Sequence, residues 1–273
     1  MKERKINLKY AINYSTAFKH SDAEHELILQ YNEEKHRTAL LNYVRQYAQE
    51  HIRFIIAAEQ MQELKDEDFK IFAAIMEIHP NIAVRISLGH KGHMVDFVDK
   101  DIPFFFDTFV DSWDMLNGMI KYGVSDVYVV NEFAFDLPQI KKVCGDVKVR
   151  VFPNVAQSTD KLHALPTINS FYIRPEDIPF YEPYVDVCEF FGPADRHDVL
   201  FRIYTEQKWL GNLKELIIGL QEDVPNTGIV PHFGDRRVRC KKACNYNNCN
   251  LCNQIMELAI SLNDNGVGIK YDK

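Results

Sequence analysis

The sequence predicts an α/β fold, and specifically a (β/α)8 barrel of the TIM type that carries a C-terminal cysteine-rich metal-binding segment. Short β-branched or aromatic runs alternate with helical stretches, which is how successive βα units read. Most of these runs end on polar residues. A length of 273 residues is ordinary for a barrel folded as one domain. We therefore expect a single domain over residues 1–273.

Eight candidate strands are expected along the chain. They are KYAINYS (9–15), RFIIAAE (53–59), AVRISL (83–88), PFFFDTF (103–109), DVYVVNE (126–132), KVRVFPN (148–154), SFYIRPE (170–176) and DVCEFFG (186–192). From the second to the seventh they recur about every 20–30 residues, close to the length of one βα unit.

Amphipathic stretches between these runs predict helices. Residues 66–79 open with acidic side chains, which suit a helix N-terminus, and residues 112–123 begin at Ser112 and stop at Gly123. The first connection, residues 16–52, is unusually long. Its ELILQYN segment (26–32) fits either an extra strand ahead of a helix at 33–50 or part of one long helix, and the sequence leaves both open.

Two helical stretches and a Pro- and Gly-rich loop follow the eighth strand, and residues 235–273 form a cysteine-rich appendage on the same domain. The net charge of −7 argues against a general nucleic-acid binder. The charged start has no signal-peptide core, and no apolar run is long enough to span a bilayer. We expect a cytoplasmic protein with no membrane partner.

Polar side chains at the strand ends form the predicted barrel mouth, because functional groups in this fold sit where strands run into the following loops. The candidates for acid–base catalysis are Glu59, Glu132 and Glu189. The candidates for substrate binding are Arg85, Asp107, Asn131, Asn154, Arg174 and Glu176. Two arginines in such a mouth require carboxylates or a ligand's anion beside them, so the set predicts a small polar or anionic substrate, or a flipped base.

Four cysteines near the C-terminus form the most specific motif. Cys240, Cys244, Cys249 and Cys252 have the spacing C-x3-C-x4-C-x2-C. Thiolates this close can surround one ion or cluster, and thiolate sulfur favours zinc or iron–sulfur. Cys188, at the end of the eighth strand, is a candidate fifth thiol. The basic stretch 235–242 leads into this segment and suits either thiolate charge balance or contact with RNA phosphate.

Two segments carry a family resemblance. Residues 121–158, KYGVSDVYVVNEFAFDLPQIKKVCGDVKVRVFPNVAQS, and residues 184–204, YVDVCEFFGPADRHDVLFRIY, resemble the collagenase-like peptidase family (the U-thirty-two peptidases), with the similarity spread over about residues 50–205. The resemblance implies a barrel enzyme with a [4Fe–4S] cluster, Zn²⁺ being the alternative, and an oxygen-independent hydroxylase or other modifying activity. In that family the ligands are spread over separated segments, whereas here all four lie in 240–252. No serine elbow, His-Glu-x-x-His helix or paired aspartates indicate peptidase chemistry.

The leading hypothesis is therefore a metal-dependent barrel enzyme, iron–sulfur in type, that modifies a polar or anionic substrate such as RNA or a small aromatic and draws on an electron donor. One alternative is a noncatalytic binding or assembly protein stapled by a structural zinc knuckle. Another is an RNA-modifying barrel with structural zinc, whose RNA affinity would fall steeply with salt.

Overall fold

The computed structural model describes residues 9–13, 25–31, 36–47, 52–129, 136–156 and 172–220, and these form an α/β fold built on parallel strands. The strands are β1 (Lys9–Asn13), β2 (His25–Gln30), β3 (Arg53–Ala57), β4 (Ile82–Ile86), β5 (Phe104–Phe106), β6 (Phe109–Val110), β7 (Asp126–Val129), β8 (Lys148–Val151) and β9 (Val187–Glu189). They form one sheet in the order β5-β4-β3-β2-β1-β9-β8-β7-β6, and every adjacent pair is parallel.

The two outermost strands of this order are neighbours in the chain. Only Asp107 and Thr108 separate β5, which pairs with β4, from β6, which pairs with β7. The backbone N–H of Ser125, just before β7, donates to the carbonyl of Phe104 over 2.7 Å. One continuous segment, residues 104–110, therefore contacts the strands on both of its sides.

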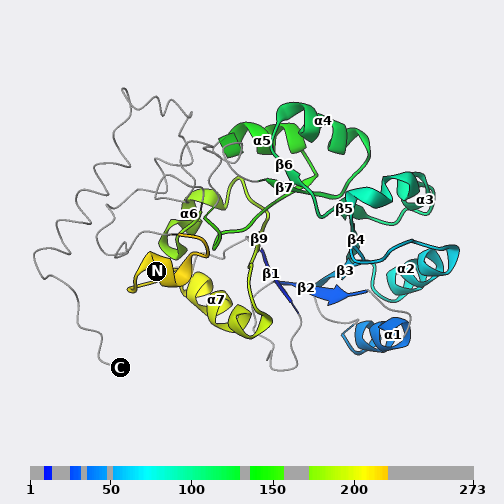
Figure 1. The fold of residues 1–273 in the computed structure, drawn as a ribbon, viewed down its shortest axis with the longest axis horizontal. Helices are drawn as coiled ribbons and strands as arrows, with labels where there is room; N and C mark the ends of the chain where they lie inside the picture. Colours follow the sequence, from blue (N-terminus) through cyan, green and yellow to red (C-terminus); the bar gives the residue numbers. More distant parts are fainter. Residues whose placement is uncertain are drawn as a thin grey trace, which may run out of the picture.

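Helices connect the strands and lie around them (Figure 1). They are α1 (His36–Gln46), α2 (Asp66–Ile78), α3 (Met94–Asp99), α4 (Trp113–Lys121), α5 (Leu137–Cys144), α6 (Ile178–Tyr181), α7 (Ala194–Glu206) and α8 (Leu213–Leu216), with 3-10 turns at Leu88–His93 and Pro175–Asp177. The helices expected at 66–79 and 112–123 are present as α2 and α4, with ends within two residues of the expected ones. Asp68 accepts a 2.8 Å hydrogen bond from the N–H of Lys65 at the start of α2, and Gly123 adopts a φ of 75° after α4. No helix in these described ranges is both long enough and apolar enough to cross a bilayer.

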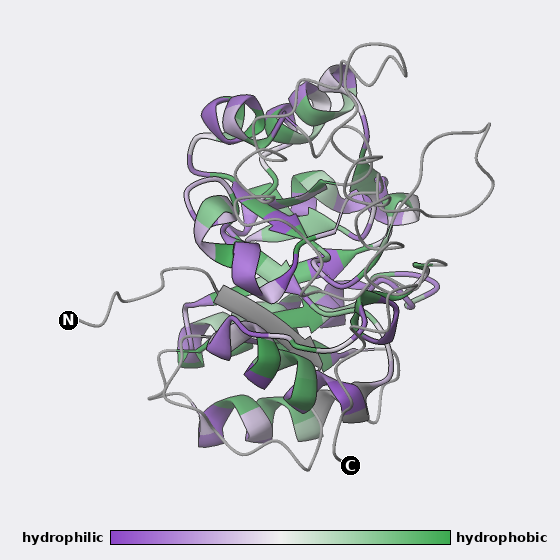
Figure 2. Ribbon diagram, turned by 90° about the vertical axis from the view of Figure 1, so that its left-hand side faces the viewer, coloured by the Kyte–Doolittle hydropathy of each residue, from purple (hydrophilic) through white to green (hydrophobic). Residues whose placement is uncertain are grey.

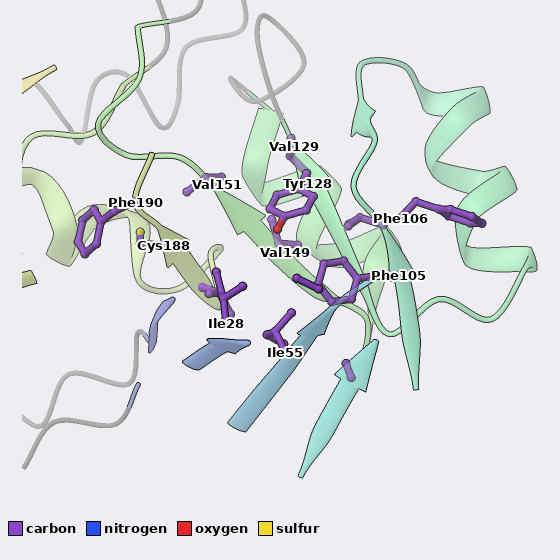
Figure 3. Packing of buried hydrophobic residues seen from close by; sticks show 14 of the residues in the cluster. Ile28, Ile55, Phe105, Phe106, Tyr128, Val129, Val149, Val151, Cys188 and Phe190 are labelled. Carbon is purple, nitrogen blue, oxygen red and sulfur yellow. The ribbon is translucent and has the colours of Figure 1, made fainter. Parts of the chain in front are cut away.

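The strands read as near-continuous hydrophobic runs because both of their faces are covered. All five residues of β3 and of β4 are buried. Ile28, Ile55, Phe105 and Tyr128 gather between the strands that carry them (Figure 3). Figure 2 shows hydrophobic residues concentrated in the strands and hydrophilic residues on the outward surfaces of the helices.

Two details decide between the expectations for the strands. The extra strand in the first connection exists as β2, followed by α1, so the strand-then-helix alternative is the right one. The strand expected at 170–176 is wrong over its described part, since residues 172–174 are not part of a strand and Pro175 opens a 3-10 turn. Because β9 pairs directly with β8, no strand position remains between them.

Candidate functional site

A cavity of about 390 Å³ opens at the carboxyl ends of the strands. Its walls come from the ends of β2, β3, β4, β7, β8 and β9 and from the β5–β6 segment. The residues that line it are Gln30, Glu59, Arg85, Asp107, Phe109, Tyr128, Phe152, Glu189, Phe190, Phe191 and Gly192. Four of the residues that the sequence predicted at the mouth, Glu59, Arg85, Asp107 and Glu189, therefore meet in one cavity.

Arg85 connects three polar side chains that line this cavity. Its Nη1 donates to Glu189 Oε1 over 2.7 Å and to the Tyr128 hydroxyl over 2.9 Å. Its Nη2 donates to Glu59 Oε1 over 2.9 Å. Burial disfavours the charged guanidinium, but these partners outweigh it and raise the pKa of Arg85 well above its ordinary value. The carboxylates of the chain itself thus provide the anionic partners that this arginine needs.

Glu189 is held as a carboxylate by three donors. Besides Arg85, the Tyr128 hydroxyl donates to its Oε2 over 2.6 Å and Arg150 Nη2 donates to the same oxygen over 3.0 Å. Burial alone would raise the pKa of Glu189, but the two guanidiniums more than offset this effect and lower it. Glu189 therefore stays ionised near neutral pH and is an anchor for Arg85 rather than a group that exchanges protons.

A buried ion-pair network continues below the cavity. Arg150 is fully buried, and its Nη1 donates to Glu26 Oε2 over 2.7 Å and to Asp126 Oδ1 over 2.9 Å. Arg53 donates to both oxygens of Asp126, over 2.8 and 2.7 Å, and to Glu26 over 3.1 Å. Burial raises the pKa of Asp126, but the two arginines lower it far below its ordinary value. Alternating charges thus run from the interior to the cavity.

Glu59 and Asp107 differ from these anchored carboxylates. Glu59 Oε1 pairs with Arg85, while its buried Oε2 has no hydrogen-bond partner among the described residues. Burial and the charge of Glu59 raise the pKa of Asp107, only partly countered by Arg85. A carboxyl group with a raised pKa beside a carboxylate with a free oxygen is an arrangement suited to moving protons.

Aromatic rings form a further part of the cavity lining, the aromatic wall. Tyr128 and Phe152 stack with ring centroids 5.3 Å apart and planes 6° from parallel. Phe109 and Phe191 stand nearly perpendicular to Phe152, at 5.7 and 5.9 Å. Phe109 is 41% exposed and Phe191 53%, so two large apolar rings border the opening of the cavity.

Three other predicted residues lie away from the cavity wall. Asn154 is buried, and its amide accepts from the N–H of Phe191 and donates to the carbonyl of the same residue. Arg174 pairs with Asp177 through bonds of 2.6 and 2.8 Å. Glu176 accepts a 2.6 Å hydrogen bond from the Trp209 N–H. Each of the three residues has a hydrogen-bond partner within the fold. Arg174 and Glu176 lie at a 3-10 turn and not at the strand end that the sequence had predicted.

The remaining predicted residues lie outside the described ranges. They are Asn131, Glu132, Cys240, Cys244, Cys249 and Cys252. Within those ranges, no three His, Cys, Asp or Glu side chains gather in a way that could hold a metal ion. Cys188 is buried in β9, and this burial raises the pKa of its thiol.

Sequence reasoning missed five residues of this site, Glu26, Arg53, Asp126, Tyr128 and Arg150. A signal was present, since Asp126 and Tyr128 stand two apart in β7 and Arg150 occupies an interior position of β8. Polar residues two apart in an otherwise apolar strand face the same side of the sheet. The amino-acid pattern therefore places Asp126 and Tyr128 on one face of the sheet.

Comparison with known proteins adds one similarity. The chain is 30% identical over 107 residues to an uncharacterized protease of Methanocaldococcus jannaschii. The match covers 35% of this chain and 30% of the length of that relative. No protein-family model matches the chain. The similarity is thus to a protein named as a protease, over about a third of each sequence.

Proposed function

We propose that the chain is a (β/α)8-barrel enzyme that modifies a small polar organic substrate in the cavity at the strand ends, with Glu59 and Asp107 moving the protons. The observation that carries this proposal is the difference between the carboxylates of one cavity. Glu189 is fixed by three donors, whereas Glu59 keeps an oxygen without a partner among the described residues and Asp107 has a raised pKa. Two carboxylates in unlike environments are the usual source of an acid and a base.

The barrel assignment is supported by the sheet order. Taking residues 104–110 as one strand gives eight parallel segments, and that segment pairs with β4 on one side and β7 on the other. A site assembled from the carboxyl ends of most strands is also the usual position of the active site in this fold.

The proposal also includes a family for this chain, the collagenase-like peptidases in the broad sense. The pattern resemblance to the collagenase-like peptidases and the partial similarity to an archaeal protein named as a protease favour the same broad group. Peptidase chemistry has no support from the cavity, whose described lining contains no serine, cysteine or histidine nucleophile. We favour a modifying enzyme, with a polar small molecule or a nucleobase as substrate and an external electron donor.

A metal centre is part of the same proposal, on the strength of its donor set. Cys240, Cys244, Cys249 and Cys252 supply four thiolates, which suit a [4Fe–4S] cluster and also suit zinc. A bound cluster would supply one-electron chemistry, and zinc would supply structural support. A reducing compartment such as the cytoplasm favours such thiolate ligands, because it keeps cysteines from forming disulfides.

The experiment is a substrate search by mass spectrometry. Protein purified without oxygen is incubated with a small-molecule extract and with RNA digests, and ions that disappear or form are recorded over time. Glu59→Gln and Asp107→Asn should slow the conversion about 10²-fold or more, because each removes a group that transfers protons. Glu77→Gln, on the exposed side of α2, is the matched control and should convert at the wild-type rate. Full activity in both cavity variants would refute the assignment.

A further inference from the structure

We infer that the cavity selects an organic cation, an amidinium, guanidinium or ammonium group carried on a flat or apolar body. The inference rests on the proposed function, because it names the class of substrate for the same cavity. It also reverses the anionic preference that two arginines in the sequence suggested.

The charge balance of the cavity lining is the first support. Three carboxylates, Glu59, Asp107 and Glu189, face one guanidinium, that of Arg85. Both terminal nitrogens of Arg85 already donate to Glu59, Tyr128 and Glu189, and its Nε, which has no partner among the described residues, is buried, so little of the guanidinium is accessible to an additional anion. Arg150 lies behind Glu189 and divides its donors among Glu26, Asp126 and Glu189. An incoming anion would meet an excess of negative charge, and an incoming cation would relieve it.

A free acceptor is the second support. Glu59 Oε2 has no hydrogen-bond partner among the described residues, and Asp107 accepts a long contact of 3.5 Å from the Thr108 hydroxyl. A buried carboxylate oxygen without a donor is costly, and an N–H of a ligand is the group that would satisfy it. Both carboxylates line the cavity, so a planar cation with two or more N–H groups could bridge them.

The aromatic wall is the third and independent support. The rings of Phe109 and Phe191 stand at 81° and 88° to that of Phe152, so rings of more than one orientation line the cavity. Cations bind favourably over such faces, and apolar ligand bodies cover exposed rings. Both rings are well exposed, at 41% for Phe109 and 53% for Phe191, which leaves apolar surface for a ligand to bury. Carboxylates and aromatic rings in the lining of one cavity together form a receptor for an organic cation.

The test uses three probes of nearly one shape and different charge, benzamidine, benzamide and benzoate, titrated into the full chain by calorimetry. We expect benzamidine to bind at least about tenfold more tightly than benzamide, and benzoate more weakly than either. Glu59→Gln should reduce the preference for benzamidine over benzamide about tenfold while leaving benzamide affinity unchanged. Glu77→Gln should change none of the three affinities.

Asp107→Asn provides a second route if Glu59→Gln does not fold, and it should weaken benzamidine in the same direction. Phe152→Leu should weaken all three probes, because it removes a wall that is indifferent to charge. Equal or tighter binding of benzoate would overturn the cation preference and leave the cavity as a substrate site. Failure of all three probes to bind would overturn both the preference and the proposed role of the cavity.

Discussion

The hydroxyl of Tyr128 donates a 2.6 Å hydrogen bond to Glu189 Oε2 while accepting one of 2.9 Å from Arg85. A single phenol therefore links the carboxyl ends of β7, β9 and β4. Burial and the neighbouring charge of Glu189 raise the pKa of Tyr128, so it remains a donor throughout the physiological range.

Tyr128→Phe removes this link and keeps the ring. Because a buried carboxylate then loses a donor, we expect the free energy of unfolding to fall by about 1–3 kcal/mol. Urea denaturation measures the change. Tyr122→Phe, at an exposed position after α4, is the control and should change stability by less than about 0.5 kcal/mol. Equal effects of the two substitutions would contradict the assigned role of the hydroxyl.

Arg150→Met tests the ion-pair network. Arg150 is fully buried among Glu26, Asp126 and Glu189, so its loss leaves buried carboxylates without compensation. A decrease of about 3–5 kcal/mol in stability is expected, which would leave little folded protein. Circular dichroism and thermal unfolding should show this loss, while Arg202→Met on the exposed side of α7 unfolds like the wild type. A stable Arg150→Met variant would mean that the network is dispensable.

Acid should destabilise the protein through the same network. The pKa values of Asp126 and Glu189 are lowered in the folded state, whereas free carboxyl groups titrate near pH 4. The unfolded chain therefore binds more protons than the folded chain below about pH 5, and stability falls as pH falls toward the folded pKa values. Urea midpoints measured between pH 7 and pH 3 should decrease, and Asp126→Asn should make that decrease shallower. An unchanged slope would show that other groups dominate.

The ionisation of Asp107 has the opposite effect on the pH dependence of stability. Its raised pKa means that the ionised form is disfavoured in the folded state, so its contribution to stability is present at low pH and lost as pH rises through the folded pKa. Asp107→Asn should therefore increase the urea midpoint at pH 7, and the difference should disappear below about pH 4. A lower midpoint at pH 7 would indicate that the carboxylate stabilises the fold.

The cysteine segment is tested by metal analysis of protein purified without oxygen. A [4Fe–4S] centre predicts about four irons and four sulfides per chain with visible absorption, whereas a zinc site predicts about one colourless zinc. Cys249→Ser with Cys252→Ser should remove the metal. Cys144→Ala is the control, because this cysteine is buried at the end of α5 and lies outside the four-cysteine motif in the sequence. Metal content that survives the double substitution would exclude these ligands.

Much of the α/β pattern could be predicted because the spacing of apolar residues within a short stretch of sequence distinguishes a strand from a helix. ELILQYN stayed ambiguous because a short apolar run fits either period, and only its pairing with β1 and β3 decides for a strand. The segment at 170–176 has strand-like residues, but Pro175 and the Arg174–Asp177 pair favour a turn.

The convergence of Glu59, Arg85, Asp107 and Glu189 followed from one rule, that parallel strands end at one edge. The ion pairs between these side chains could not be predicted from the sequence, because they depend on the register between strands that are far apart in the chain. Arg85 and Glu189 are 104 residues apart, and the deeper pair of Arg150 and Glu26 is 124 residues apart. No local pattern specifies such partners.

The two residues between β5 and β6 give the sheet a seam that is also part of the cavity. The N–H of Asp107 donates to the carbonyl of Ile86 over 2.8 Å, so the backbone of this residue is fixed to β4 while its side chain lines the cavity together with Glu59. Burial, and after it the charge of Glu59, raises the pKa of Asp107, so a displacement of this segment that exposed the side chain would lower that pKa. The proton affinity of Asp107 therefore depends on the position of the two-residue connection that joins β5 to β6.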